Sequence, residues 1–317
     1  MKNNNLFLKD HTELLNIQNQ GNITVAQISY DTAVLDSIIS LHEAFDENLI
    51  IVKELEESER VNTIELENLS ESYIFILDGD ILKGAKQNRV VNTSVLVAPK
   101  SKIILPVSCV EEGRWEYKSS RFKPSDEIAH RSIRYSKANY ISESKKLNRV
   151  DFVADQSTVW NKVASVSDSL EFHSKTMSHS DLFENYKEEL EDISKKFKMQ
   201  PKANGLLIFV GNQMVACDIF NNNKIYRDYF NKIIKTSAID SKIKKDNDHL
   251  ISLDKAIIMQ SLNDIFDQFE KSKENASFTP GVSEGVETRL NLDDNTFYGL
   301  SHKGESVHQS ILSSSSK

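Results

Sequence analysis

The 317-residue chain is predicted to be an α+β protein, with a strand-rich antiparallel N-terminal half and with helices and a β-hairpin in the C-terminal half. Three observations predict this fold class. Short apolar runs separated by turn residues fill the first 117 residues, and loops this short favour antiparallel connections. From about residue 124 the apolar residues recur with helical spacing. Two alternating runs flanking Gly211-Asn-Gln213 then predict a hairpin.

The N-terminal elements follow from these patterns in order. Residues 22–30 alternate apolar and polar positions, as a strand does, whereas the apolar spacing over 32–45 predicts a short amphipathic helix. The continuous apolar run Tyr73-Ile-Phe-Ile-Leu77 predicts a central strand, followed by a turn at Asp78-Gly-Asp80. Four further runs predict strands: 49–54 and 62–67 around an acidic turn at 56–59, then 90–97 and 103–110 joined by a turn at 98–101.

The C-terminal elements are mostly helical at first. Polar segments with helical apolar spacing predict helices at 124–140 and 151–172, and an apolar stripe predicts an amphipathic helix over 181–198 that Pro201 ends. The remaining predicted elements are hairpin strands at 205–210 and 214–220, helices at 224–238 and 254–272, and short strands near 286–291, 296–301 and 306–312.

The change in texture divides the chain into two predicted regions. Residues 1–123 form a strand-rich region that carries a polar motif block, and residues 124–312 form a mixed helix and hairpin region packed on it as one compact unit. The serine-rich end, 313–317, is predicted to be a disordered tail.

Composition excludes several classes of protein. Lys and Arg number 39 against 47 Asp and Glu, a formal charge of −8 that argues against broad nucleic-acid binding. Two Cys exclude a disulfide scaffold and a cysteine-built zinc or iron–sulfur site, and the eight His follow no metal-binding spacing. With no long apolar stretch and no signal-peptide core, we expect no membrane association and a cytoplasmic location.

One polar cluster between apolar strands carries most of the functional signal. In Gly84-Ala-Lys-Gln-Asn-Arg89, Lys86 and Arg89 offer positive charge, Gln87 and Asn88 offer amide groups, and Gly84 permits close backbone approach. Such a cluster suits a phosphate, a carboxylate or a nucleotide edge, although it is not a P-loop. In the alternative interpretation these side chains brace loops, with Lys86 and Arg89 paired to Glu111, Glu112 or Asp80.

Arginine gathers in the same part of the chain. Arginines are scarce, yet six of the nine lie within one 61-residue window: Arg89, Arg114, Arg121, Arg131, Arg134 and Arg149. Because guanidinium is a planar, bidentate donor, the excess suggests an anion to be held there, and structural ion pairs are the equal alternative.

The strand that follows the cluster adds candidate reactive groups. Cys109 lies in an apolar strand, so a core role is favoured over nucleophilic catalysis, for which Lys86 or Arg114 would have to lower its pKa. Glu111 is a candidate base or ribose-hydroxyl acceptor, with an ion pair to Arg114 as the equal alternative. Trp115 suits base stacking or a place at the edge of the core.

The same block resembles a known family. Gly84-Ala-Lys-Gln-Asn-Arg89, Asn92 and Pro106-Val-Ser-Cys-Val-Glu-Glu-Gly-Arg-Trp115 are similar to the ARG- and rhodanese-phosphatase-superfamily-associated protein domain family. The resemblance extends over about 22–312 and includes Val52-Lys-Glu54. The family is named for gene neighbourhoods with an ADP-ribosylglycohydrolase and a rhodanese-superfamily phosphatase. The resemblance therefore implies work beside NAD or ADP-ribose chemistry, in bacterial conflict or stress systems.

Three functions remain open at this stage. In the first, the protein recognises, and in one version processes, ADP-ribose or another anionic, nucleotide-like small molecule through Lys86, Gln87, Asn88, Arg89 and Arg114. In the second, it is a non-catalytic interaction module, with a homo-oligomer or a protein partner. In the third, it is a hydrolase that uses Glu111 or Cys109. The residues do not identify a cofactor.

Overall fold

The chain folds as two interleaved units, each with its own sheets and helices. The computed structural model describes residues 5–35, 37–55, 62–113, 119–149, 151–244 and 253–314. The first unit comprises Met1–Asp36, Leu190–Thr279 and Gly285–Lys317, and the second comprises Ser37–Glu189 and Pro280–Glu284. The α+β prediction is confirmed. No helix within those described ranges is long and apolar enough to cross a bilayer.

The first unit is built on an eight-stranded sheet. Its strand order is β1-β2-β12-β13-β17-β16-β15-β14, and the pairs from β1 through β15 are antiparallel. The strands are β1 (Thr12–Gln20), β2 (Ile23–Tyr30), β12 (Gly205–Val210), β13 (Gln213–Phe220), β14 (Ser277–Pro280), β15 (Val286–Leu292), β16 (Asn295–His302) and β17 (Glu305–Ser313). The predicted hairpin and the three predicted C-terminal strands are confirmed.

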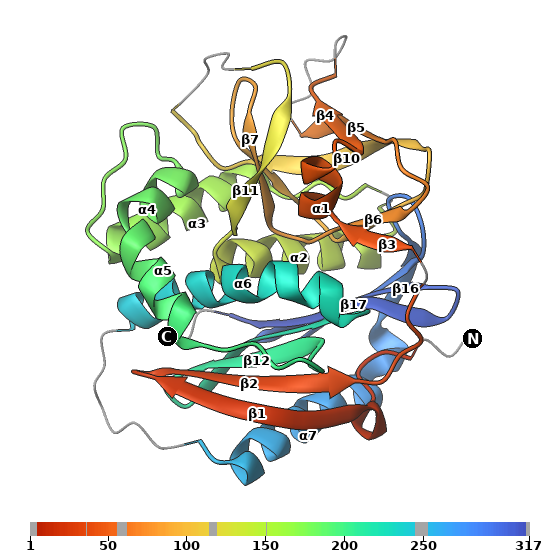
Figure 1. Ribbon diagram of the computed structural model, residues 1–317, viewed down its shortest axis with the longest axis vertical. Helices are drawn as coiled ribbons and strands as arrows, with labels where there is room; N and C mark the ends of the chain where they lie inside the picture. Colours follow the sequence, from red (N-terminus) through yellow and green to blue (C-terminus); the bar gives the residue numbers. More distant parts are fainter. Residues whose placement is uncertain are drawn as a thin grey trace. The chain divides into compact units, whose positions relative to one another are not determined.

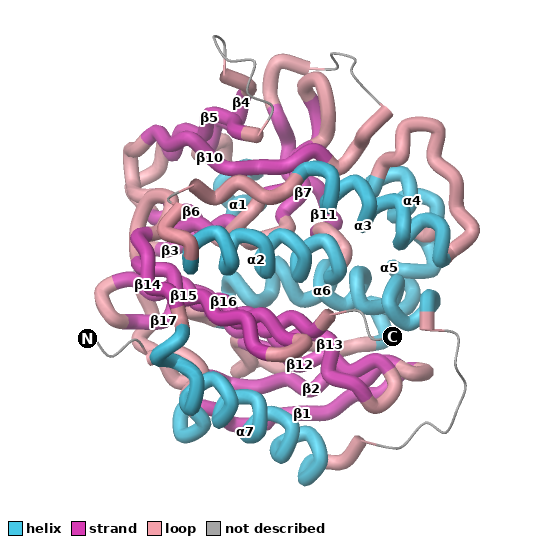
Figure 2. The backbone as a smooth tube through the Cα atoms, turned by 180° about the vertical axis from the view of Figure 1, so that it is seen from behind, coloured by secondary structure: helices cyan, strands magenta, loops and turns pink. Residues whose placement is uncertain are grey.

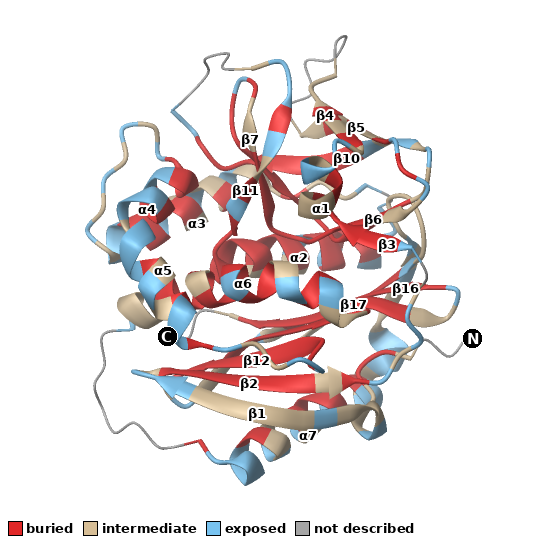
Figure 3. Cartoon of the chain, in the orientation of Figure 1, coloured by how far each residue is buried: buried red, intermediate tan, exposed pale blue. Residues whose placement is uncertain are grey.

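Helices α6 (Asn223–Ile243) and α7 (Lys255–Ser272) cover opposite faces of this sheet (Figures 1 and 2). The apolar stripe of α7, which includes Leu262 and Phe266, packs into one core cluster with residues of β2 and β12. Burial on both faces explains why β2 and β12 are buried along their length in Figure 3, whereas the edge strand β1 is largely intermediate. The stripe predicted over 254–272 is therefore a core face.

The second unit contains two smaller sheets. A six-stranded sheet has the order β11-β7-β8-β10-β5-β4, and a three-stranded sheet has the order β3-β6-β9. The strands are β3 (Ile38–Ser40), β4 (Ile50–Lys53), β5 (Thr63–Asn68), β6 (Tyr73–Ile76), β7 (Asp80–Gly84), β8 (Arg89–Val91), β9 (Val95–Val97), β10 (Lys102–Cys109) and β11 (Phe122–Ile128). The central position predicted for β6 is confirmed, although its pairing with β3 is parallel.

Two helices support the strands that carry the polar motif block. Ile81 of β7, Val90 of β8 and Val110 share a core cluster with Ile133 of α2 and Val159 of α3. The helices of this part of the chain are α1 (Leu41–Asp46), α2 (Arg131–Lys146), α3 (Gln156–Ser169), α4 (His179–Asn185) and α5 (Lys187–Lys196). Single turns of 3-10 helix lie at Lys9–His11 and Lys273–Asn275.

Two predictions in the N-terminal half are wrong in part. The helix predicted over 32–45 is the buried strand β3 followed by α1, and Ser40 caps α1 by accepting a hydrogen bond from the Glu43 N–H. The single strand predicted over 90–97 is two strands, because the buried polar residues between them turn the chain from one sheet to the other. Ser94 there accepts a hydrogen bond from the backbone of Asp78 at 2.9 Å.

Two helix predictions in the middle of the chain need a similar correction. The first part of 124–140 is strand β11, which pairs with β7, and the helix begins only at Arg131. The segment 181–198 is two helices that meet at Tyr186. The strands β1 and β7 were not predicted, since β1 is a polar edge strand and β7 had been interpreted as a turn and loop. The acidic turn at 56–59 lies outside the described residues.

Candidate functional site

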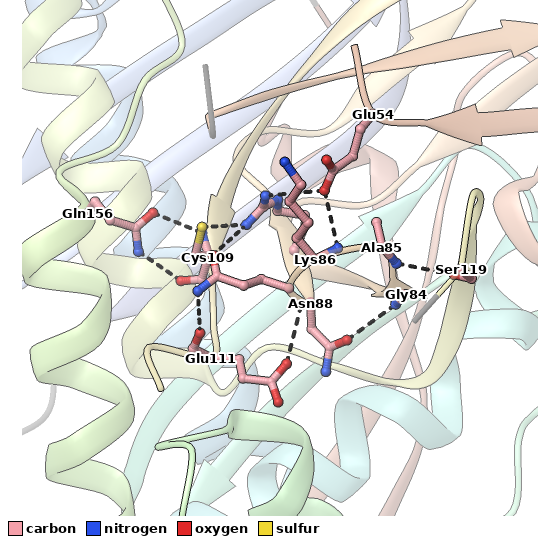
Figure 4. Close-up of polar contacts among 11 residues, drawn as sticks. Glu54, Gly84, Ala85, Lys86, Asn88, Cys109, Glu111, Ser119 and Gln156 are labelled. Carbon is pink, nitrogen blue, oxygen red and sulfur yellow. Dashed lines mark hydrogen bonds and ion pairs between the residues drawn. The ribbon is translucent and has the colours of Figure 1, made fainter. Parts of the chain in front are cut away.

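The polar motif block lies where the β7–β8 hairpin meets the end of β10 (Figure 4). Antiparallel pairing of β8 with β10 sets Arg89 opposite Cys109, and side chains of opposed residues project from the same face of a sheet. The hairpin loop begins with backbone in the left-handed region at Gly84 (φ +133°) and Ala85 (φ +45°). A Cβ at position 84 would come within 2.8 Å of the Arg121 carbonyl oxygen, so glycine is required there.

Arg89 is the central charge of this block. Its side chain is only 3% exposed, and its Nη1 donates to the Gln87 Oε1 at 3.0 Å and to the Cys109 Sγ. Its Nη2 lies 3.7 Å from a carboxylate oxygen of Glu54. Its Nε is buried and has no hydrogen-bond partner among the described residues. The contacts of Nη1 and Nη2 thus fix the orientation of this buried guanidinium, while its Nε–H remains an unused donor.

Glu111 lies in the same block and is held by hydrogen-bond donors. The residue is 4% exposed, and its two carboxylate oxygens accept from the Asn88 N–H at 3.4 Å and from the Thr176 hydroxyl at 3.3 Å. Its backbone carbonyl accepts from the Gln87 amide at 2.9 Å. The sequence had offered Glu111, Glu112 or Asp80 as the partner of Arg89, and the structure pairs Arg89 with Glu54 instead.

Cys109 has the features of a core thiol. Burial raises its pKa, the positive charge of Arg89 opposes that shift, and the carboxylate of Glu54 adds to it. Among the described residues, the cation that contacts the thiol is Arg89, whereas the sequence had considered Lys86 and Arg114 for this role. Gln156, the first residue of α3, fixes the backbone here, since its amide accepts from the Cys109 N–H and donates to the Cys109 carbonyl, each at 2.8 Å.

The remaining predicted site residues differ in exposure and in the contacts that they make. Lys86 is exposed, and its backbone N–H donates to Glu54 at 3.3 Å. Asn88 is buried, and its amide oxygen accepts from the Gly84 N–H at 3.3 Å. Asn92 is also buried, but its side chain bonds to the Phe152 carbonyl and the Ser108 hydroxyl, so it supports the fold behind the block. Arg114 and Trp115 lie outside the described residues.

Sequence reasoning missed Glu54, Gln156 and Thr176 as members of this site. Glu54 stood in the segment that carried the family resemblance, which was the only available signal for it. Gln156 and Thr176 reach the block from the start of α3 and from the loop before α4. No local pattern links these residues to positions 84–111, so only the tertiary contacts place them.

A pocket and a metal-binding cluster are the alternatives to this block. A pocket of about 260 Å³ lies in the first unit, between β13, α7 and the ends of β16 and β17, and contains none of the predicted site residues. No group of three or more His, Cys, Asp and Glu side chains placed to hold a metal ion occurs in the described part of the chain. The polar block therefore remains the candidate site.

Comparison with known families covers nearly the whole chain. Residues 11–312 match the model of the ARG and Rhodanese-Phosphatase-superfamily-associated Protein domain. Because the match spans most of the sequence, the chain belongs to this family, as its resemblance predicted. No curated protein and no solved structure matches the chain.

Proposed function

We propose that this member of the ARG and Rhodanese-Phosphatase-superfamily-associated Protein domain family recognises an anionic, nucleotide-like small molecule at the polar block, and that ADP-ribose or NAD is the ligand to test first. The observation that carries the proposal is Arg89, a buried cation with an unused Nε donor beside an exposed lysine. Arginine is the side chain best suited to bind phosphate, because its planar guanidinium can donate two parallel hydrogen bonds to two phosphate oxygens.

The surrounding residues supply the other contacts that such a ligand requires. Gln87 and Cys109 hold the guanidinium in one orientation, which lowers the entropy cost of forming its hydrogen bonds. Lys86 adds a positive charge at the exposed end of the loop, suited to a second phosphate. Glu111 brings a carboxylate, the usual partner of ribose hydroxyls, to the same block.

The family name supports the choice of ligand. The family is named after ARG and a rhodanese-type phosphatase. By the resemblance described above, ARG stands for an ADP-ribosylglycohydrolase, an enzyme that acts on ADP-ribose groups. A protein that works beside such enzymes in a bacterial conflict or stress system would handle NAD-derived molecules. Of the hydrolytic alternatives, Glu111 acting as a base is compatible with its position in the polar block. A nucleophilic Cys109 is disfavoured by its raised pKa.

Calorimetry with ADP-ribose and NAD tests this proposal. We expect Arg89→Lys to weaken binding by about tenfold or more, because it keeps the charge but loses the planar fork. Lys86→Ala should weaken binding by about two- to fivefold, as for a single exposed phosphate contact. Lys100→Ala, which removes an exposed lysine paired with Glu71 in the same unit, is the matched control and should change little.

Thermal unfolding of each variant shows whether Arg89→Lys still folds, since that residue is buried. If ADP-ribose and NAD bind all four proteins equally, the polar block is not the binding site. If neither molecule binds the wild type, these two ligands are ruled out.

A further inference from the structure

Glu54 occupies the place beside Arg89 where an anion would bind. Its Oε1 lies 3.7 Å from the Arg89 Nη2, and the same oxygen accepts a hydrogen bond from the Lys86 N–H at 3.3 Å. One carboxylate oxygen therefore pairs with a guanidinium and accepts a hydrogen bond from a loop N–H. A phosphate oxygen would bind to the same two groups.

Exposure distinguishes the two partners of this ion pair. The Arg89 side chain is 3% exposed, whereas that of Glu54 is 29% exposed and follows directly after the end of β4. Arg89 cannot lose its counter-charge without leaving a buried cation uncompensated, which is costly. Glu54 can turn toward water at little cost, because part of its side chain is already solvated.

We infer that Glu54 is an internal competitor, which fills the anion subsite of Arg89 in the free protein and is displaced when an anionic ligand binds. The exchange replaces one anion by another, so Arg89 stays compensated throughout. A negatively charged group with an acceptor oxygen, such as a carboxylate or a phosphate, can reproduce the contacts of Glu54. This inference rests on the proposed anion-binding role of Arg89. It adds that Glu54 limits which anions can bind at Arg89.

Anion rescue of a Glu54 variant tests the inference without knowledge of the natural ligand. Thermal unfolding of wild type, Glu54→Ala and Glu71→Ala is measured in sodium chloride and in sodium acetate or sodium phosphate at the same ionic strength. Glu71 is the matched control, because it is an exposed acid paired with Lys100 and its loss changes the net charge equally.

We expect Glu54→Ala to be less stable in chloride and to regain stability in acetate or phosphate. At a concentration about ten times its Kd, a bound anion raises the folding equilibrium constant about elevenfold. Wild type and Glu71→Ala should show no such gain. Equal responses of the three proteins would overturn the inference. If Glu54→Ala does not fold, Glu54→Gln, which keeps the volume of the side chain, takes its place.

Ligand titration separates this inference from the proposed function. If Glu54 fills the subsite about nine-tenths of the time, its removal tightens ADP-ribose binding about tenfold. Equal ADP-ribose affinities for wild type and Glu54→Ala would reject the competitor role while leaving the proposed function intact. Anion rescue without any ADP-ribose binding would reject ADP-ribose as the ligand while keeping the competitor role of Glu54.

Discussion

Replacement of Lys137 by methionine is expected to lower the free energy of unfolding by about 3–5 kcal/mol, the usual cost of breaking a buried ion pair from one side. The Lys137 side chain is fully buried, and its Nζ donates to the Asp78 carboxylate at 2.6 Å and to the Val91 carbonyl at 2.5 Å. Methionine keeps most of the volume but leaves Asp78 with Arg134, whose Nε lies 3.6 Å from that carboxylate. Urea unfolding monitored by circular dichroism measures the loss.

The same helix provides the control for this experiment. Lys146 of α2 pairs with Glu143 one turn earlier, and both side chains are well exposed. Lys146→Met should therefore change stability by less than about 0.5 kcal/mol. Similar losses for the two variants would show that helix propensity, and not the buried pair, determines the effect at position 137.

Stability is expected to fall as the pH falls below about 6.5, with His179 as one identifiable cause. Burial lowers the pKa of this histidine from 6.5 to about 3, with smaller contributions from His130 and Lys83. Its Nε2 accepts a hydrogen bond from the His130 N–H at 3.0 Å, so the folded protein holds the neutral ring. The unfolded chain binds the proton more readily, which costs the folded state about 1.4 kcal/mol for each pH unit between 6.5 and 3.

A glutamine at position 179 tests this assignment, because its amide oxygen can accept the same hydrogen bond and cannot titrate. Between pH 7 and pH 4 the wild type should lose about 3 kcal/mol more stability than His179→Gln. The exposed His173 lies six residues earlier, and His173→Gln should follow the wild-type profile. Parallel pH profiles for wild type and His179→Gln would assign the acid sensitivity to other groups.

Asp78, Lys137 and His179 also support the candidate site. The Asp78–Lys137 pair fixes the turn between β6 and β7, and β7 leads directly into the Gly84–Arg89 loop. The backbone N–H of His179 donates to the carbonyl of Val110 at 3.0 Å, beside Cys109 and Glu111. Loss of the Asp78–Lys137 pair should therefore loosen the supports of the polar block, and ligand binding by Lys137→Met would fall with its stability.

Local sequence patterns were sufficient for much of the fold and for the location of the polar block. The hairpin β12–β13 and the helix α7 were predicted because turn chemistry and apolar periodicity act over a few residues. The residues Gly84 to Arg89 were recognised because directional groups lie together between apolar strands. The helix predicted over 124–140 was wrong in its first part, because cross-strand pairing with β7 outweighs an apolar spacing that resembles a helix.

By itself, the sequence determined the α+β class and the family, and it singled out the polar block as the candidate site. Only the tertiary structure decided that Arg89 faces Cys109 and that its counter-charge is Glu54. The register of β8 on β10 and the place of β4 in the same sheet depend on hydrogen bonds between distant segments. Local propensity does not encode such pairings, and the burial that makes Arg89 need a counter-charge arises only when these segments come together.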